Sequence, residues 1–270
     1  MEIGLLLVQA VLMFAVAFIY SNLGLGGGLL FVPILLSTNV PASDLAVPVS
    51  LTLTIATATS SVINHHRHGL VAYRLGGVLV AGALIGTLLG TSFTLYILND
   101  RAFRAFFVAV LLLFGAYMIR DWMRNARAID EDDHAKMTRN RVAATAGATA
   151  GSGFLSGSMG IGGGLLNVPL LVYVLGRRTR LAIGTSSLLI IPTAAVGFVA
   201  YLIGLGALGG GFAIPDEFRL IPILVPVVFV GAYAGSRWGL RRLKTRSVAL
   251  IFILVLYLAA GKLVVDLAFG

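Results

Sequence analysis

The stretch Asn22-Leu-Gly-Leu-Gly-Gly-Gly-Leu-Leu-Phe-Val-Pro-Ile-Leu-Leu36 has a second copy in this chain, Ser158-Met-Gly-Ile-Gly-Gly-Gly-Leu-Leu-Asn-Val-Pro-Leu-Leu-Val172. Nine of the fifteen aligned residues are identical at an offset of 136 residues. The same offset pairs Ala46-Val-Pro-Val-Ser50 with Ala182-Ile-Gly-Thr-Ser186. Four matched glycines and a matched Val-Pro indicate an internal duplication rather than a chance likeness of apolar segments.

The composition around these copies is that of a membrane protein. Of the 270 residues, 58% are hydrophobic and 11% are charged, whereas soluble domains carry about 25% charged residues. A spanning helix needs about 20 apolar residues. Six apolar runs of suitable length predict spanning helices at 46–63, 75–98, 105–119, 182–203, 220–236 and 248–265.

Four shorter apolar runs form two pairs, each split by a glycine cluster: 3–20 with 29–37, and 142–156 with 165–175. Arms this short suit a re-entrant hairpin better than two full crossings, although 3–20 is long enough to cross. The prediction is an all-α, polytopic transmembrane bundle of two repeats, each with three full spanning helices and one glycine-split hairpin. The repeats are residues 1–122 and 141–270, with a linker at 123–140.

The basic residues predict the orientation, because cytoplasmic loops are enriched in Lys and Arg. With the linker inside, 16 Lys and Arg lie inside, and four, Arg101, Arg104, Arg219 and Lys262, lie outside. Equivalent loops of the two halves have opposite charge bias, which predicts inverted repeats. We expect a multi-pass protein of the inner (plasma) membrane with a cytoplasmic linker and both termini outside. The net charge of +9 is then a topology signal, and no nucleic-acid partner is expected.

Further glycines recur at every fourth residue, and this spacing predicts close helix packing. They are Gly82, Gly86 and Gly90 in the first half and Gly231, Gly235 and Gly239 in the second, and an offset of 145 pairs Gly86 with Gly231 and Gly90 with Gly235. The change of offset indicates an extra glycine-rich loop around Gly204–Gly211.

The glycine clusters are the predicted binding site. Broken backbone at membrane depth survives where it is buried or lines a cavity, and the helix that follows begins with free N–H groups that favour an anion. Two such tips from opposite faces of the membrane would meet near the midplane. The alternatives are helix breaking for packing and a nucleotide loop, which lacks a βαβ context. The predicted glycines are Gly24, Gly26, Gly27, Gly28, Gly160, Gly162, Gly163 and Gly164.

Uncharged polar residues near the tips can donate hydrogen bonds to an oxyanion, or can bond between helices instead. The predicted binding residues are Asn22, Ser50, Ser158, Asn167, Thr185 and Ser186, with Thr52 and Ser187 as further candidates. The spans hold no deeply placed charge, so a substrate that brings its own charge is favoured over a relay of buried carboxylates.

The histidines His65, His66 and His68 end the first predicted full span. Proton coupling through His65 and His66 is one interpretation. A metal cluster and a solvated basic helix end are the others. No catalytic set, cofactor motif or cysteine is present, so neither an enzyme nor a bound cofactor or metal is expected.

The segment Gly-Ile-Gly-Gly-Gly-Leu-Leu-Asn-Val-Pro at 160–169, followed by Ala182-Ile-Gly-Thr-Ser186, resembles the sulfite exporter TauE/SafE family (DUF81, the toluene-sulfonate uptake permease group) over essentially the whole chain. The resemblance implies a secondary transporter of sulfite, sulfonates and related sulfur-containing anions. A passive anion channel and a carrier of another small organic anion are the alternatives. Pro48 and Val49 replace the Gly-Thr pair in the first copy, which makes the second copy the stronger site.

Overall fold

The computed structural model describes residues 3–38, 43–124, 138–209, 216–242 and 245–269, and every element in these ranges is a helix. The predicted all-α class is therefore confirmed for the described residues. The order is α1 (Ile3–Tyr20), α2 (Gly28–Thr38), α3 (Ser43–Arg67), α4 (Tyr73–Ile97), α5 (Asp100–Arg124), α6 (Arg139–Met159), α7 (Gly164–Pro169), the π-turn η1 (Leu170–Val174), α8 (Thr179–Gly209), the 3₁₀ turn η2 (Asp216–Leu220), α9 (Ile221–Arg242) and α10 (Thr245–Phe269).

Among the described residues, five helical segments are long and apolar enough to cross a membrane: Leu45–Arg67, Tyr73–Ile97, Asp100–Arg120, Thr179–Gly206 and Phe218–Trp238. They cover five of the six predicted spans. The sixth coincides with α10, whose 25 residues extend about 37 Å at 1.5 Å per residue. Within its described residues, α10 has an apolar helical stretch at Leu256–Val265.

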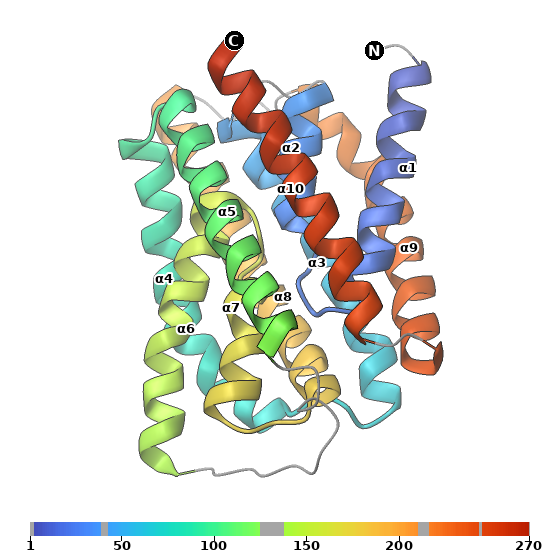
Figure 1. The fold of residues 1–270 in the computed structure, drawn as a ribbon. Helices are drawn as coiled ribbons and strands as arrows, with labels where there is room; N and C mark the ends of the chain where they lie inside the picture. Colours follow the sequence, from blue (N-terminus) through green and yellow to red (C-terminus); the bar gives the residue numbers. More distant parts are fainter. Residues whose placement is uncertain (1–2, 39–42, 125–137, 210–215, 243–244, 270) are drawn as a thin grey trace.

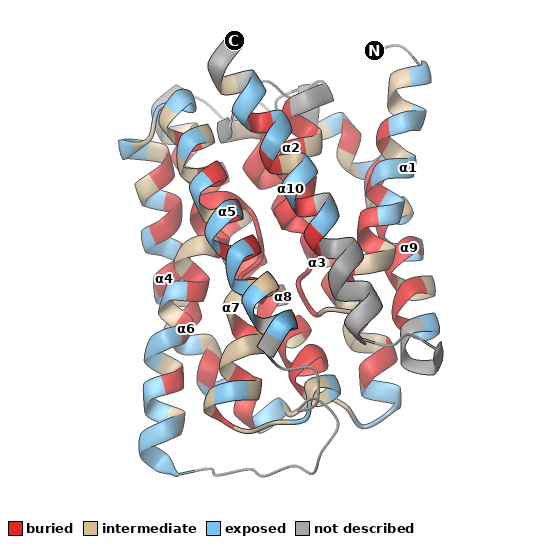
Figure 2. Cartoon of the chain, viewed as in Figure 1, coloured by how far each residue is buried: buried red, intermediate tan, exposed pale blue. Residues whose placement is uncertain are grey.

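The outer surface of the bundle is apolar. Large hydrophobic side chains such as Val11, Ile85 and Leu113 are exposed on α1, α4 and α5. Buried residues gather instead on the inward faces of the helices, as Figure 2 shows. An apolar exterior around a packed interior suits a protein surrounded by lipid, because each helix presents its hydrophobic side outward as well as inward.

Two helical hairpins enter the bundle from opposite ends (Figure 1). α1 runs inward, the chain turns near the middle, and α2 returns to the end where α1 began. α6 enters from the other end, and α7 with η1 returns there. α6 has 21 residues, longer than the predicted arm 142–156, and its first turn extends the helix toward the linker.

The two halves are interlocked by the glycines that recur every fourth residue. A Cβ on Gly86 of α4 would lie 1.8 Å from the Ala150 carbonyl oxygen of α6. In the other half, a Cβ on Gly235 of α9 would lie 2.1 Å from the Phe18 carbonyl oxygen of α1. Only glycine allows such backbone contact, so the predicted packing role is confirmed for Gly82, Gly86, Gly90, Gly231 and Gly235. The surroundings of Gly239 lie outside the described residues.

The prediction of a glycine-rich loop from Gly204 is wrong over its first part, because α8 continues as a helix to Gly209. Gly204 packs against α4, where a Cβ would lie 2.4 Å from Leu95 Cδ1, so here glycine provides room between helices. Residues 210–215 of this loop and 125–137 of the linker lie outside the described residues.

Candidate functional site

Two glycine turns link the arms of the hairpins, and their backbones follow the same path. In the first turn, the φ angles of Gly24, Gly26 and Gly27 are 68°, 76° and 92°. In the second, Gly160, Gly162 and Gly163 have φ angles of 70°, 82° and 74°. Residues that carry a Cβ atom rarely adopt this left-handed backbone conformation. This explains why both copies of the sequence have glycine at these matched positions.

The turns touch each other directly at the centre of the bundle. A Cβ on Gly28 would lie 2.1 Å from the Gly160 carbonyl oxygen, and a Cβ on Gly164 would lie 2.5 Å from the Gly24 carbonyl oxygen. The offset of 136 residues relates Gly24 to Gly160 and Gly28 to Gly164. The first half therefore makes the same contact with the second half as the second makes with the first. The glycines therefore let two backbones from opposite hairpins come together.

A shared pair of side chains lies against both turns. A Cβ on Gly26 would lie 2.8 Å from Thr54 Cγ2 and 3.2 Å from Ile190 Cδ1. A Cβ on Gly162 would lie 2.5 Å from Thr54 Cγ2 and 2.9 Å from Ile190 Cγ2. Thr54 and Ile190 are themselves related by the offset of 136. The contacts of the turns with this one pair of side chains thus repeat when the two halves are exchanged.

Each glycine turn accepts a hydrogen bond from one serine of the opposite half. Ser50 Oγ donates to the Gly160 carbonyl oxygen at 2.9 Å, and Ser186 Oγ donates to the Gly24 carbonyl oxygen at 2.7 Å. Both serines are fully buried. In this structure both hydroxyl groups therefore donate hydrogen bonds between segments of the protein. Anion binding by Ser50 and Ser186 stays a prediction.

Most of the other predicted polar residues bond to nearby carbonyl oxygens. Asn22 Nδ2 donates to Phe18, Thr52 Oγ1 to Pro48, Thr185 Oγ1 to Leu181 and Ser187 Oγ to Ile183. Each bond spans four residues, as is common for polar side chains in apolar helices. Thr185 Oγ1 also accepts the Ala72 N–H at 3.0 Å, which joins α8 to the segment before α4.

Ser158 and Asn167 differ from these residues. Both are buried, with relative exposures of 0% and 1%. Ser158 Oγ and Asn167 Nδ2 have no hydrogen-bond partner among the described residues. Buried polar groups are normally paired, so each of these two atoms has hydrogen-bonding capacity that the described residues leave unused.

The sequence reasoning missed three polar residues in this region. Ser152 Oγ donates to Asn167 Oδ1 at 2.5 Å, and the Oγ atoms of Ser156 and Thr54 are buried without a partner among the described residues. The signal was present in α6, where Thr145, Thr149, Ser152 and Ser156 recur at helical spacing and are buried. Such a polar stripe in an apolar segment indicates an interior face.

The three histidines separate in the structure. His65 is buried, with 3% exposure, and its Nδ1 lies 2.8 Å from the Ser61 carbonyl oxygen. His66 and His68 are exposed. The interpretation of a solvated helix end is therefore wrong for His65. Among the described residues no group of three or more His, Cys, Asp or Glu could hold a metal ion.

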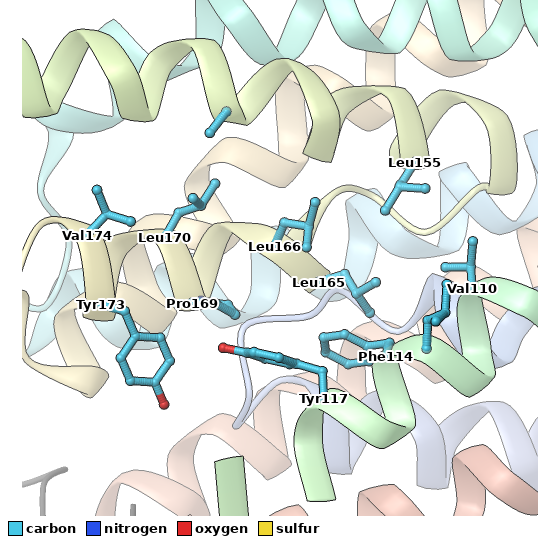
Figure 3. A pocket seen from close by; sticks show the side chains of 12 residues that line it. Val110, Phe114, Tyr117, Leu155, Leu165, Leu166, Pro169, Leu170, Tyr173 and Val174 are labelled. Atoms are coloured by element: carbon cyan, nitrogen blue, oxygen red, sulfur yellow. The ribbon is translucent and has the colours of Figure 1, made fainter. Parts of the chain in front are cut away.

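A cavity of about 530 Å³ lies beside the hairpin of the second half (Figure 3). Its walls are apolar side chains of α5, α6, α7 and η1, among them Phe114, Leu165 and Pro169, together with the rings of Tyr117 and Tyr173. None of the predicted binding residues lines it. Leu113 on its wall is 72% exposed, so this cavity lies at the apolar outer surface of the bundle.

Comparisons with known proteins agree with this architecture. A family model described as "Sulfite exporter TauE/SafE" matches residues 9–263. The chain is 26% identical over 263 residues to "Probable membrane transporter protein YunE" of Bacillus subtilis, covering 91% of this chain and 92% of that protein. It is 27% identical over 232 residues to "Probable membrane transporter protein YdhB" of the same organism, with coverages of 84% and 87%.

A "Probable membrane transporter protein" of Xylella fastidiosa is 31% identical over 174 residues, covering 64% of this chain and 65% of that protein. No solved structure matches this chain significantly.

Proposed function

This chain belongs to the sulfite exporter TauE/SafE family of membrane transporters, and from that premise we propose that it is a secondary transporter of small sulfur-containing anions such as sulfite or organosulfonates. The substrate binds near the bilayer midplane, where the two glycine turns meet. The sulfur chemistry follows from the family's description. The anionic class is supported by the start of α2 directly after its glycine turn, because the first N–H groups of a helix favour an anion.

The observation that carries the proposal is the exchange-symmetric contact between Gly28 and Gly160 and between Gly164 and Gly24. Two inverted repeats related by an axis in the membrane plane would place their re-entrant hairpins in this way. Transporters built from inverted repeats bind substrate at the repeat interface and expose it alternately to the two sides. We assign that role to the turns, with one repeat rocking against the other.

The proposed recognition relies on uncharged groups. α2 begins at Gly28, immediately after its glycine turn, and the first N–H groups of a helix favour an anion. Asn22, Ser158, Asn167 and Thr185 supply polar side chains around the turns, and Ser50 and Ser186 become donors when the turns separate. In a site shielded from water, such neutral donors hold an anion strongly.

The proposed membrane is the bacterial inner (plasma) membrane. α3 ends, and α6, α8 and α10 begin, at one end of the bundle (Figure 1), and the basic residues Arg67, Arg139 and Arg178 belong to these helix ends. The positive-inside rule places this end in the cytoplasm. The first turn of α1 and the last turn of α10 are at the opposite end, so both termini are proposed to face outward.

Flux measurements in proteoliposomes test the proposal. We expect saturable uptake of ³⁵S-labelled sulfite, or of a small sulfonate such as methanesulfonate, and faster exchange when unlabelled substrate is present on the opposite side. A flux that follows voltage alone, without saturation or counter-transport, would show a passive channel. No flux with either anion would overturn the sulfur-anion assignment.

We propose that His65 couples transport to protons. The exposed His66 serves as the control. Ser61 and Ser187 connect His65 to the interior: Ser61 Oγ lies 3.3 Å from His65 Nδ1 and 3.1 Å from Ser187 Oγ. Among the described residues, His68 and Arg180 are the charged or titratable side chains whose charge acts on His65. If protons drive the flux, an imposed pH gradient changes its rate in the wild type and in His66→Gln. His65→Gln loses the response, and an equal response in all three proteins contradicts the assignment.

A further inference from the structure

The two glycine turns share a backbone path but have different surroundings, and this difference locates the anion more closely. Three polar residues gather at the second turn. A Cβ on Gly163 would lie 3.2 Å from Ser152 Oγ, Ser152 donates to Asn167, and Thr193 Oγ1 lies 3.4 Å from the Gly162 carbonyl oxygen.

Apolar and aromatic side chains take the places at the first turn that match Ser152, Ser156 and Asn167, whereas Thr193 is matched by another threonine, Thr57. The offset of 136 pairs Ser152 with Val16, Ser156 with Tyr20 and Asn167 with Phe31. A Cβ on Gly27 would lie 2.6 Å from Phe31 Cζ, so the Phe31 ring lies directly against this turn. Where the second turn has an amide and a hydroxyl, the first has a ring and a branched alkyl group.

The second turn also has donors to spare. Asn167 Oδ1 accepts from Ser152, while Asn167 Nδ2, which is a pure donor, has no partner among the described residues. Ser156 lies one helical turn beyond Ser152 on α6, is fully buried, and its Oγ also lacks a partner among the described residues. These buried groups would normally be satisfied.

The chemistry of the unused groups indicates the ligand. An N–H₂ group and a hydroxyl can donate to an acceptor-rich oxyanion, whereas a cation would need acceptors, and Asn167 Oδ1 is already engaged. No charged residue occurs between 142 and 176, so nothing in this hairpin neutralises the ligand's charge. The donors therefore suit one compact anionic head group held by hydrogen bonds.

We propose that this chain binds one oxyanion rather than two, at the second glycine turn alone, with Asn167 Nδ2 and Ser156 Oγ as donors and Ser152 holding the Asn167 amide in place. Phe31 occupies the place at the first turn that Asn167 has at the second. This inference rests on the proposed function, because it takes the substrate to be a sulfur oxyanion. It adds which half binds the anion, how many anions bind, and two residues, Ser152 and Ser156.

Equilibrium binding of ³⁵S-labelled sulfite to the full chain in nanodiscs tests the inference, with unlabelled methanesulfonate as a competitor. We expect the wild type to bind one sulfite per chain. Asn167→Leu, which keeps the side chain's size, and Ser156→Ala should each weaken binding tenfold or more, as expected for the loss of one hydrogen bond to a charged group. Phe31→Leu is the matched control at the first turn and should bind within about twofold of the wild type, because no donor is removed.

The outcomes separate the two proposals. Two sulfite ions per wild-type chain, or equal weakening by Asn167→Leu and Phe31→Leu, would overturn the single-site inference and leave the transporter assignment intact. A wild type that binds neither sulfite nor methanesulfonate would overturn the proposed substrate class itself. Ser156→Ala removes a single oxygen atom, so a folded Ser156→Ala protein that binds like the wild type would also contradict the inference.

Discussion

At the scale of single residues, the contact between the two glycine turns depends on the absence of two Cβ atoms. Gly28→Ala places a methyl group 2.1 Å from the Gly160 carbonyl oxygen, and neither backbone can move without disturbing its hairpin. We expect Gly28→Ala to destabilise the protein by at least about 3 kcal/mol, the upper range for overpacked cores, measured as thermal stability in detergent.

The control for this substitution is Gly151→Ala in α6. A Cβ at Gly151 would meet no atom within 4 Å, and alanine favours helix over glycine by about 1 kcal/mol. Gly151→Ala should therefore be neutral or slightly stabilising. If Gly28→Ala were as stable as Gly151→Ala, the turns would not be in contact in the native protein.

The serines that fasten the turns give a second prediction at this scale. Ser50→Ala leaves the Gly160 carbonyl oxygen without its 2.9 Å donor and should cost about 1 kcal/mol. For a chain of this size that lowers the melting temperature by about 2–4 °C. Ser186→Ala should behave alike because its bond is the equivalent one.

Thr52→Val is the matched control for the serines, since among the described residues Thr52 Oγ1 donates within its own helix, to the Pro48 carbonyl oxygen. We expect a smaller loss for Thr52→Val than for Ser50→Ala. A larger loss would indicate that Ser50 contributes little to joining the hairpins.

Residue-scale features were only partly readable from the sequence. The offset of 136 identified Ser50 and Ser186 as equivalent positions. The residue types alone could not show that these two hydroxyl groups donate to carbonyl oxygens that are 110 and 162 residues away in the sequence. Ser152 was missed because small residues such as Gly151, Ser152 and Gly153 also serve helix packing. The helical spacing from Thr149 to Ser156 indicated an interior face, but only the structure shows that Ser152 bonds to Asn167.

At the scale of elements, α4 and α6 are held at backbone contact by glycine. Gly86→Ala would raise helix propensity, yet its methyl group would lie 1.8 Å from the Ala150 carbonyl oxygen. We expect Gly86→Ala to lower thermal stability in detergent, whereas Gly77→Ala in the same helix, where a Cβ meets nothing within 4 Å, should not. Equal effects would mean that α4 and α6 are farther apart than the structure has them.

Most elements could be predicted because lipid imposes one pattern on a spanning helix, a run of about 20 apolar residues. The breaks between α1 and α2 and between α6 and α7 were equally visible, since glycine clusters interrupt these runs. Glycine was also the source of the error at Gly204–Gly209. The residue that opens a turn at Gly24 makes room for Leu95 at Gly204, and the sequence alone does not distinguish these two uses.

At the scale of the whole molecule, the proposed orientation can be tested with single cysteines, because the natural chain has none. Arg101 near the start of α5 and Arg178 just before α8 are both exposed, and these helices begin at opposite ends of the bundle (Figure 1). Arg101→Cys should react with a membrane-impermeant maleimide in intact cells. Arg178→Cys should react only after permeabilisation.

The cysteine-free parent chain is the control for this labelling. If Arg178→Cys were labelled in intact cells and Arg101→Cys were not, the orientation would be the reverse of the one proposed. Labelling of both from outside would contradict the separation of the two helix starts.

The interlocking of the halves also sets an order of events during synthesis. Phe14 of α1 contacts Gly231 of α9, which is 217 residues later in the chain. At about 5–20 residues per second, the ribosome makes that partner about 10–40 s after α1. Until then the first hairpin, with the amide of Gln9 that becomes fully buried in the finished protein, resides in the membrane without the helix that encloses it. The first hairpin is therefore made before α9, the helix that packs against α1 in the finished protein.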